Sequence, residues 1–168
     1  MNIWSLLRMQ NPDHLMNLED SEISIGQLVS MIHRTHMVYL NNRMKKLDIS
    51  AGQFPFLMVL FNKEGITQDE IAADVHMDKG TVARALKKLE DNKYIYRAID
   101  LNNRRKYIIY LTEKGKLVVP KILAIDTEWE DFLCNSPSSG DKYAQIYAVL
   151  KNLAVKSMEK VENNGELD

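Results

Sequence analysis

The 168-residue sequence lacks most features of secreted, membrane-spanning or disulfide-stabilised proteins. Cys134 is its only cysteine, which excludes a disulfide framework within one chain and fits a reducing cytoplasm. No stretch approaches the roughly 20 consecutive apolar residues of a membrane span. The first 22 residues have Arg8 as their only fixed basic side chain and make a poor signal peptide. We therefore expect a cytoplasmic protein with no membrane contact.

Signatures of catalysis are also missing. The sequence contains no Ser-His-Asp order in a motif context, no Walker loop and no paired carboxylates at a catalytic spacing. His33 and His36 are three residues apart on an expected helix, but no carboxylate or thiol beside them completes a metal site. Cys134 is of a type that more often packs as an apolar residue. We expect no enzyme, no metal site and no cofactor.

Positive charge is concentrated in one window of the chain. The whole sequence has a net charge of −1, whereas the window from Asp78 to Lys106 has nine Lys or Arg and four Asp or Glu, a net of +5. The remaining residues therefore carry −6. A pI near 6.4 argues against a general nucleic-acid coat. The local excess nevertheless indicates one surface that meets phosphates.

Three Ser/Thr-x-x-Glu/Gln capping boxes, at Ser24, Ser50 and Thr67, predict helix starts. The first helix should begin near Ser21 or Ser24 and run for over twenty residues, to about Asp48. The second should begin at the Ser50 box and continue through Phe61, which places Pro55 at about its fifth position. There the proline costs a backbone hydrogen bond and bends the first turn. The third should end near residue 75.

A turn at residues 76–78 separates the third helix from a basic helix over residues 79–91, for which Asp78 is the expected N-cap. Its apolar positions, Val82, Leu86 and Leu89, are spaced to face a core. Beyond this helix the hydrophobic period changes from 3.6 to 2. That change predicts strands over residues 94–99 and 106–111, joined by a loop over 100–103.

Long helices flank this middle region. Thr112 should cap a helix that is kinked at Pro120, with an apolar face formed by Leu117, Ile122, Ile125, Trp129 and Leu133. Residues 135–141 should form a loop, and a final helix should run over about 142–160. The apolar faces of the first and last helices lack a partner within one chain, so we expect a homodimer.

The expected fold is mostly α with a small β-hairpin wing, an α+β winged helix-turn-helix. We predict an N-terminal arm and dimerisation helix over residues 1–47, a DNA-binding domain over 48–112 and C-terminal dimerisation helices over 113–168. In this fold the second helix of the motif can enter the DNA major groove. The predicted DNA contacts are Lys79, Gly80, Thr81, Arg84, Lys87 and Lys88 on the basic helix and Asn103, Arg104 and Arg105 on the wing.

Chemistry assigns roles to several of these contacts. Arg84 can donate two hydrogen bonds to a guanine, and Thr81 can touch a thymine methyl or a phosphate. The wing arginines can enter a narrow minor groove. The alternative for the basic helix alone is a solvated lysine-rich face. A basic helix followed by two wing arginines at winged-helix spacing favours DNA binding.

The chain resembles the MarR family of transcriptional regulators over roughly residues 22–160. The resemblance rests on Ile66-Thr67-Gln68, Ile71-Ala72, Gly80-Thr81-Val82-Ala83-Arg84, Leu89-Glu90, Asn103-Arg104-Arg105 and Leu111-Thr112 with Gly115. The wing signature of the family is D-x-R, then five residues and L-T. Arg105, Leu111 and Thr112 match it, but Asn103 replaces the aspartate that braces the wing arginine. Either the brace is weaker here or Asp100 substitutes.

The resemblance implies a homodimer that binds pseudo-palindromic double-stranded DNA near promoters, and we expect the protein to act as a repressor. Many members of the family release DNA when a small aromatic or phenolic acid binds between the dimer arms and the winged lobe. The candidate residues for such an effector are His33, Arg34, His36, Tyr39 and Met58. The alternative is that these residues make dimer or surface contacts. The alternative function is a winged-helix interaction module whose basic face binds an acidic protein.

Overall fold

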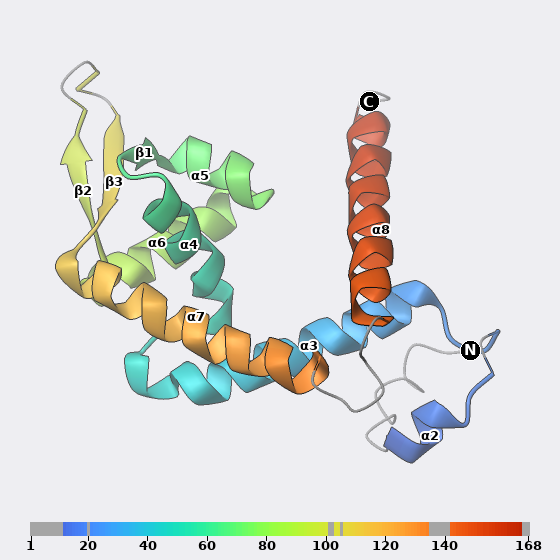
Figure 1. Ribbon diagram of the computed structural model, residues 1–168. Helices are drawn as coiled ribbons and strands as arrows, with labels where there is room; N and C mark the ends of the chain where they lie inside the picture. Colours follow the sequence, from blue (N-terminus) through green and yellow to red (C-terminus); the bar gives the residue numbers. More distant parts are fainter. Residues whose placement is uncertain (1–11, 20, 101–102, 105, 135–141, 166–168) are drawn as a thin grey trace. The chain divides into compact units, whose positions relative to one another are not determined.

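The computed structural model describes residues 12–19, 21–100, 103–104, 106–134 and 142–165. It is mostly helical with a three-stranded antiparallel sheet (Figure 1), which confirms the predicted fold class. Internal contacts divide the chain into two compact units, Met1–Ile122 and Leu123–Asp168. Among the described residues, no helix has the length and apolar character that crossing a membrane requires.

The first capping box works as predicted. Helix α3 (Ile25–Met44) follows the short α2 (Pro12–Met16) and begins at Ser24. The Ser24 backbone N–H donates to Gln27 Oε1 at 2.7 Å, and the Gln27 N–H donates to Ser24 Oγ at 3.2 Å. The α-helix ends earlier than the predicted Asp48, because the 3₁₀ helix η1 (Lys45–Leu47) tightens the last turn.

The second capping box corrects one prediction. Ser50 and Gln53 form a capping box at the start of the 3₁₀ helix η2 (Ala51–Gln53), and helix α4 (Phe54–Asn62) begins only after η2. Pro55 therefore lies in the first turn of α4 rather than at its fifth position. A backbone N–H in the first turn has no acceptor within the helix, so the expected loss of a hydrogen bond does not arise.

The helix-turn-helix forms at the predicted residues. Helix α5 (Gln68–Val75) begins at the Thr67 capping box, in which the Thr67 N–H donates to Glu70 Oε2 at 2.7 Å. His76 has a left-handed backbone (φ 51°) and ends α5. Helix α6 (Lys79–Asp91) then begins after Asp78 and ends at Asn92, as predicted.

The wing is a hairpin of β2 (Ile95–Ile99) and β3 (Tyr107–Leu111), paired from Ile95↔Leu111 to Ile99↔Tyr107. A third strand, β1 (Ile66–Thr67), pairs with β3 in the order β1-β3-β2 and was not predicted. With only two residues, β1 is too short to show an alternating pattern. Because it leads directly into α5, it joins the wing to the helix-turn-helix.

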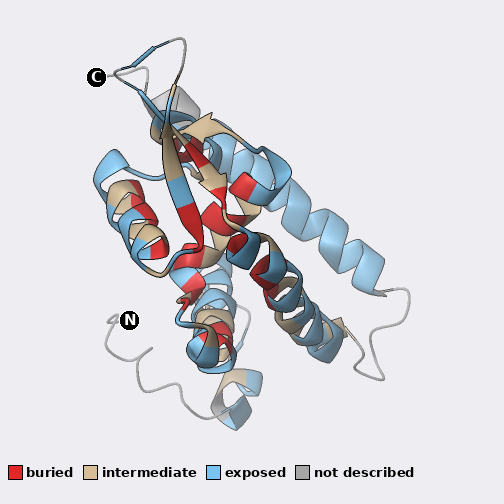
Figure 2. Ribbon diagram, turned by 90° about the vertical axis from the view of Figure 1, so that its left-hand side faces the viewer, coloured by how far each residue is buried: buried red, intermediate tan, exposed pale blue. Residues whose placement is uncertain are grey.

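The core lies where α4, α5, α6 and the sheet meet, and Figure 2 shows the buried residues gathered there. Its fully buried members include Phe56, Leu57, Leu60, Ile71, Val82, Leu86, Leu89, Ile95, Ile109 and Ile122. Burying a side chain of this size stabilises a fold by roughly 1.5–3 kcal/mol before entropy is counted. The predicted apolar stripe of the basic helix is therefore part of the core.

Helix α7 (Glu113–Cys134) begins at Thr112, whose Oγ1 accepts from the Gly115 N–H at 3.1 Å. The helix continues past Pro120 to Cys134. Of the predicted apolar face, Ile122 is completely buried and Ile125 is half-buried, but Leu117 is 68% exposed. Val118 and Val119 contribute to the buried side of the helix instead of Leu117.

The second compact unit contains the rest of α7 and the helix α8 (Lys142–Gly165), which extends beyond the predicted end at residue 160. The predicted loop over residues 135–141 lies outside the described residues. All side chains of α8 that the structure describes, residues 143–161, are exposed. Half of its 24 residues are nevertheless apolar, as expected for a helix that pairs with another surface.

Gly115 makes the first turn of α7 possible. A Cβ atom at this position would lie 2.2 Å from the carbonyl oxygen of Tyr94 and 3.1 Å from a side-chain carbon of Leu111. The first is a backbone atom of the segment that leads into the sheet, so it cannot rotate away. Glycine is therefore required here because the first turn of α7 packs closely against Tyr94 and Leu111 at the ends of the wing strands.

Replacing Gly115 by alanine should lower the free energy of unfolding by about 3 kcal/mol, the upper end of the usual cost of overpacking. Urea unfolding at neutral pH measures this change. Gly52→Ala is the matched control, because a Cβ there has no heavy atom within 4 Å. We expect it to stay within about 1 kcal/mol of the parent. Equal stability of the two variants would contradict the packing of α7.

Candidate nucleic-acid interface

Helix α6 has one buried face and one charged face. Val82, Leu86 and Leu89 are completely buried. The predicted contact residues Lys79, Gly80, Arg84, Lys87 and Lys88 are all exposed, and Thr81 is half-buried. The helix is therefore fixed by its apolar side while its basic side meets solvent. This is the arrangement that a helix needs to enter a DNA groove.

Asp78 caps the amino end of α6. Its Oδ1 accepts from the Thr81 N–H at 2.8 Å. Hydrogen bonds from Thr81, with a smaller contribution from the charge of Arg84, hold the pKa of the Asp78 carboxyl below its ordinary value. The cap is therefore charged at neutral pH, and the first turn of α6 is held at the end where recognition helices touch bases.

The two residues predicted to read bases contact one another. Arg84 Nη2 donates to Thr81 Oγ1 at 3.0 Å. Gly80 precedes them, and a Cβ at this position would lie 3.2 Å from Asp78 Oδ1. Glycine therefore leaves room for the cap as well as for close approach of the backbone to a ligand.

Two lysines of the predicted interface are paired with carboxylates. Lys79 Nζ lies 2.9 Å from Asp69 Oδ1 on α5, and Lys87 Nζ lies 2.6 Å from Asp91 Oδ1 one turn along α6. The hydrogen bond and charge of Asp91 raise the pKa of Lys87. Exposed pairs of this kind contribute only about 0–1 kcal/mol, so a phosphate can replace either carboxylate at small cost.

The wing loop closes between Asp100 and Lys106. The Asp100 N–H donates to the Lys106 carbonyl at 3.0 Å, and the Lys106 N–H donates to the Asn103 carbonyl at 2.8 Å. Asn103 and Arg104 are exposed, as a DNA contact requires. Arg105 lies outside the described residues, so whether Asn103 or Asp100 braces it stays a prediction.

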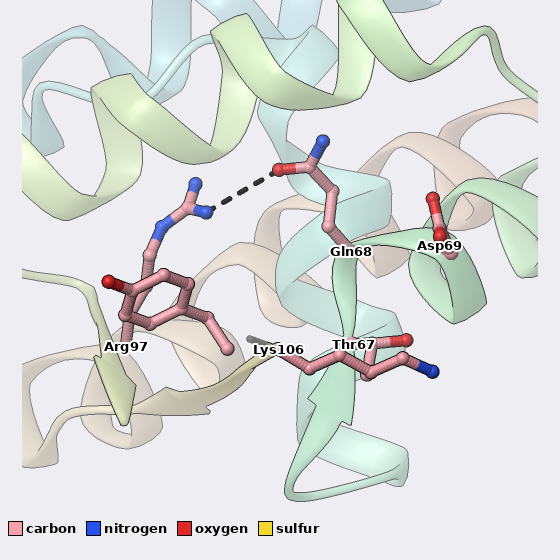
Figure 3. A pocket seen from close by; sticks show the side chains of 6 residues that line it. Thr67, Gln68, Asp69, Arg97 and Lys106 are labelled. Carbon is pink, nitrogen blue, oxygen red and sulfur yellow. Dashed lines mark hydrogen bonds between the residues drawn. The ribbon is translucent and has the colours of Figure 1, made fainter. Parts of the chain in front are cut away.

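Sequence reasoning missed Arg97, which connects three elements. From β2, its Nε lies 3.3 Å from Glu90 Oε2 on α6, and its Nη1 lies 3.5 Å from Gln68 Oε1 on α5 (Figure 3). The sequence did contain a signal for this residue. Arg97 lies between Ile95 and Ile99 on one face of the predicted strand, where a charged side chain needs a partner. We call Arg97, Glu90 and Gln68 the Arg97 bracket.

A pocket of about 230 Å³ lies beside this bracket, between the start of α5 and the wing. Its lining residues are Thr67, Gln68, Asp69, Arg97, Lys106 and Tyr107. Arg97 and Asp69 have partners of opposite charge, Glu90 and Lys79. Because two of its three charged lining residues, Arg97 and Asp69, are paired in this way, the pocket is a joint between the wing and the helices rather than a strongly cationic site.

The predicted effector residues do not line this pocket. His33 and Arg34 are exposed on α3, whereas His36, Tyr39 and Met58 are half-buried. The Arg43 guanidinium lies 5.8 Å from the centre of the Tyr39 ring, a cation–π distance. The effector assignment stays a prediction.

The described part of the chain contains no group of three or more His, Cys, Asp or Glu side chains arranged to hold a metal ion. His33 and His36 therefore have no third ligand of these types among the described residues. Cys134, at the end of α7, is half-buried and forms no disulfide.

Known proteins share the sequence pattern and the fold of this chain. A model of the MarR family matches residues 49–107. The HTH-type transcriptional regulator SarZ of Staphylococcus haemolyticus is 32% identical over 141 residues, which cover 82% of this chain and 95% of SarZ. The solved MarR transcriptional regulator from Methanosarcina mazei is 35% identical, with a TM-score of 0.73 over 80% of this chain and 96% of that one.

A solved complex of MepR from S. aureus with DNA is 28% identical and has a TM-score of 0.73, over 80% of this chain and 98% of that one. Fold and site together define a winged helix-turn-helix protein whose basic second helix is exposed. The chain belongs to the MarR family, a family of DNA-binding transcription regulators. SarZ and the Methanosarcina mazei protein are both transcriptional regulators.

Proposed function

We propose that this protein binds double-stranded DNA as a homodimer and represses transcription, with α6 in the major groove and the wing in the adjacent minor groove. The observation that carries the proposal is the way in which α6 is packed, with one face buried and the other exposed. Its apolar stripe is fully buried while Lys79, Arg84, Lys87 and Lys88 face solvent. The likeness to MepR, which was solved with DNA, supports the same use of the fold.

In this proposal each contact residue has a distinct part. Thr81 and Arg84 read base edges near the capped end of α6, where Gly80 lets the backbone approach. The lysines Lys79, Lys87 and Lys88 meet phosphates, which position the helix without reading sequence. Asn103, Arg104 and Arg105 form the wing contact with the minor groove.

We propose that a second copy of the chain covers the exposed apolar surfaces of α3 and α8. On α3 these are Ile25, Leu28, Val29, Ile32 and Val38, and on α8 they include Ile146, Tyr147, Val149, Leu150, Leu153 and Met158. Large contiguous apolar patches on the surface of a monomer mark interaction sites. Residues 1–47 and 113–168 then act as dimerisation arms around a DNA-binding domain of residues 48–112.

A dimer of this kind would present two α6 helices to two half-sites about one helical turn, ~34 Å, apart on a pseudo-palindromic operator. Binding near a promoter would then exclude the transcription machinery. We also propose that a small aromatic acid releases the DNA by binding near His33, Arg34, His36, Tyr39 and Met58. An arginine and a phenol beside methionine offer a carboxylate partner and adaptable apolar walls.

The test of DNA binding is a gel shift with the duplex upstream of the gene for this protein. We expect a shifted band that the same unlabelled duplex competes away and an unrelated duplex does not. Arg105→Ala should weaken binding and lower the slope of log K against log salt concentration by about one unit, because a released counterion is lost.

Lys121→Ala is the control for this titration, because Lys121 is an exposed lysine on α7 outside the proposed interface. Its affinity and salt slope should match those of the parent. An unchanged slope for Arg105→Ala would contradict the wing assignment. Absence of any competed band for the parent chain would contradict DNA binding itself.

Leu150→Glu should convert the dimer to monomers in sedimentation velocity, because a charge cannot be buried unpaired in an apolar interface. Loss of the second half-site should then weaken operator binding by about tenfold or more. Asn152→Glu adds the same side chain on the opposite side of α8 and should leave the dimer intact. Dissociation of both variants, or of neither, would argue against this surface.

Calorimetric titration with salicylate tests the effector. We expect heat of binding and, in a parallel gel shift, release of the duplex at saturating salicylate. Arg34→Ala should weaken the binding of salicylate while DNA binding without salicylate persists. A titration without heat, together with an unchanged gel shift, would exclude this class of effector.

A further inference from the structure

Arg97 is the innermost charged residue of the wing. It lies in the middle of β2, opposite Ile109 of β3, and Ile109 pairs in turn with Ile66 of β1. Its side chain is 25% exposed, and that of Glu90 is 32% exposed. An ion pair that is partly withdrawn from water is screened less than a surface pair. The Arg97–Glu90 pair is therefore screened less by solvent than the exposed lysine pairs are.

On the face of β2 that carries Arg97, the exposure of the side chains rises sharply from Arg97 toward the tip of the wing. Ile95 is buried, Arg97 is half-buried and Ile99 is 56% exposed, while Tyr107 opposite Ile99 is 54% exposed. The apolar core therefore supports the hairpin only as far as the Arg97↔Ile109 pair. At this level of the hairpin, the Arg97 bracket links β2 to both helices of the helix-turn-helix.

The bracket joins both helices of the motif to the wing. Glu90 lies in the last turn of α6, and Gln68 is the first residue of α5. A guanidinium has several N–H donors in one plane and can serve two acceptors on different elements at once, which an ammonium group does less well. Its charge is balanced by Glu90, so this arginine is committed to a contact within the protein.

We propose that Arg97 is a positioning residue for DNA binding: through Glu90 and Gln68 it fixes the angle between the wing and α6. This inference rests on the proposed function. It predicts that the bracket residues act on DNA through the wing arginines Arg104 and Arg105. Without the bracket, the wing must be ordered when DNA binds, and that cost reduces affinity.

Glu90→Gln separates positioning from plain electrostatics. This variant removes a negative charge from a surface that faces phosphate, so charge alone would tighten binding. Loss of the bracket should instead weaken binding to the upstream duplex by about fivefold. The matched control is Asp91→Asn, which removes the neighbouring carboxylate, paired with Lys87 and not with the wing. It should bind equally or more tightly.

A double-mutant cycle gives the second readout. Arg97→Gln should weaken binding by about fivefold to tenfold in the parent chain. In a chain with alanine at both Arg104 and Arg105 it should change affinity by less than about twofold. Thermal unfolding of each variant, measured beside the affinities, verifies that the folded state persists at the assay temperature.

Tighter binding by Glu90→Gln would overturn the proposal, as would an equal effect of Arg97→Gln in both backgrounds. If Arg97→Gln does not fold, Glu90→Gln in the two backgrounds decides by the same criterion. Failure of the proposed function is recognised separately, since the parent chain would then not shift the duplex at all.

Discussion

The burial of the apolar stripe of α6 is the interaction on which the DNA-binding surface depends. Val82, Leu86 and Leu89 pack completely inside a core shared with α4, α5 and the sheet. Since 3.6 residues make one turn, fixing this stripe also fixes the direction of every other side chain on the helix. Lys79, Arg84 and Lys88 therefore lie on the solvent side of the helix. There Lys79 contacts Asp69 and Arg84 contacts Thr81. A loss of packing here would disorder the interface before any of its cations were changed.

Among the described residues, three of the nine cations in the basic window form ion pairs within the protein. Lys79 and Lys87 each contact a carboxylate, and Arg97 contacts Glu90. The exposed lysine pairs are weak, so they exchange readily for phosphates. The Arg97 pair is half-buried, and its guanidinium serves two helices. The same window of +5 charge therefore contains two kinds of cation, those that DNA can recruit and one that maintains the shape of the wing.

The apolar surfaces outside the core explain why the flanking helices are so long. The described side chains of α8 are exposed although many are apolar, and the first half of α3 is similar. In a single chain these faces cost free energy by remaining in water. A second copy of the chain would remove that cost and would also set the spacing of two recognition helices. Assembly and DNA recognition are in this view two consequences of one arrangement of helices.

Local features of the structure were predictable from the sequence. The capping boxes at Ser24 and Thr67, the Asp78 cap and the hairpin all depend on residues a few positions apart. The box at Ser50 was found correctly, but the sequence did not reveal that a 3₁₀ turn would precede α4. That turn moved Pro55 into a position without strain. The strand β1 was missed because two residues carry no periodic signal.

The sequence alone determined that this chain has a winged helix-turn-helix with a basic second helix between two long arms, because periodicity, capping and charge are written in short segments. Only the tertiary structure decided which cations are free and which are committed. Arg97, Glu90 and Gln68 are separated by up to 29 positions and meet only because β2 packs beside both helices. Likewise, the need for glycine at position 115 arises only because the carbonyl of Tyr94 lies against it in the folded chain. Contacts between elements depend on how whole faces pack together, and no short stretch of sequence contains that information.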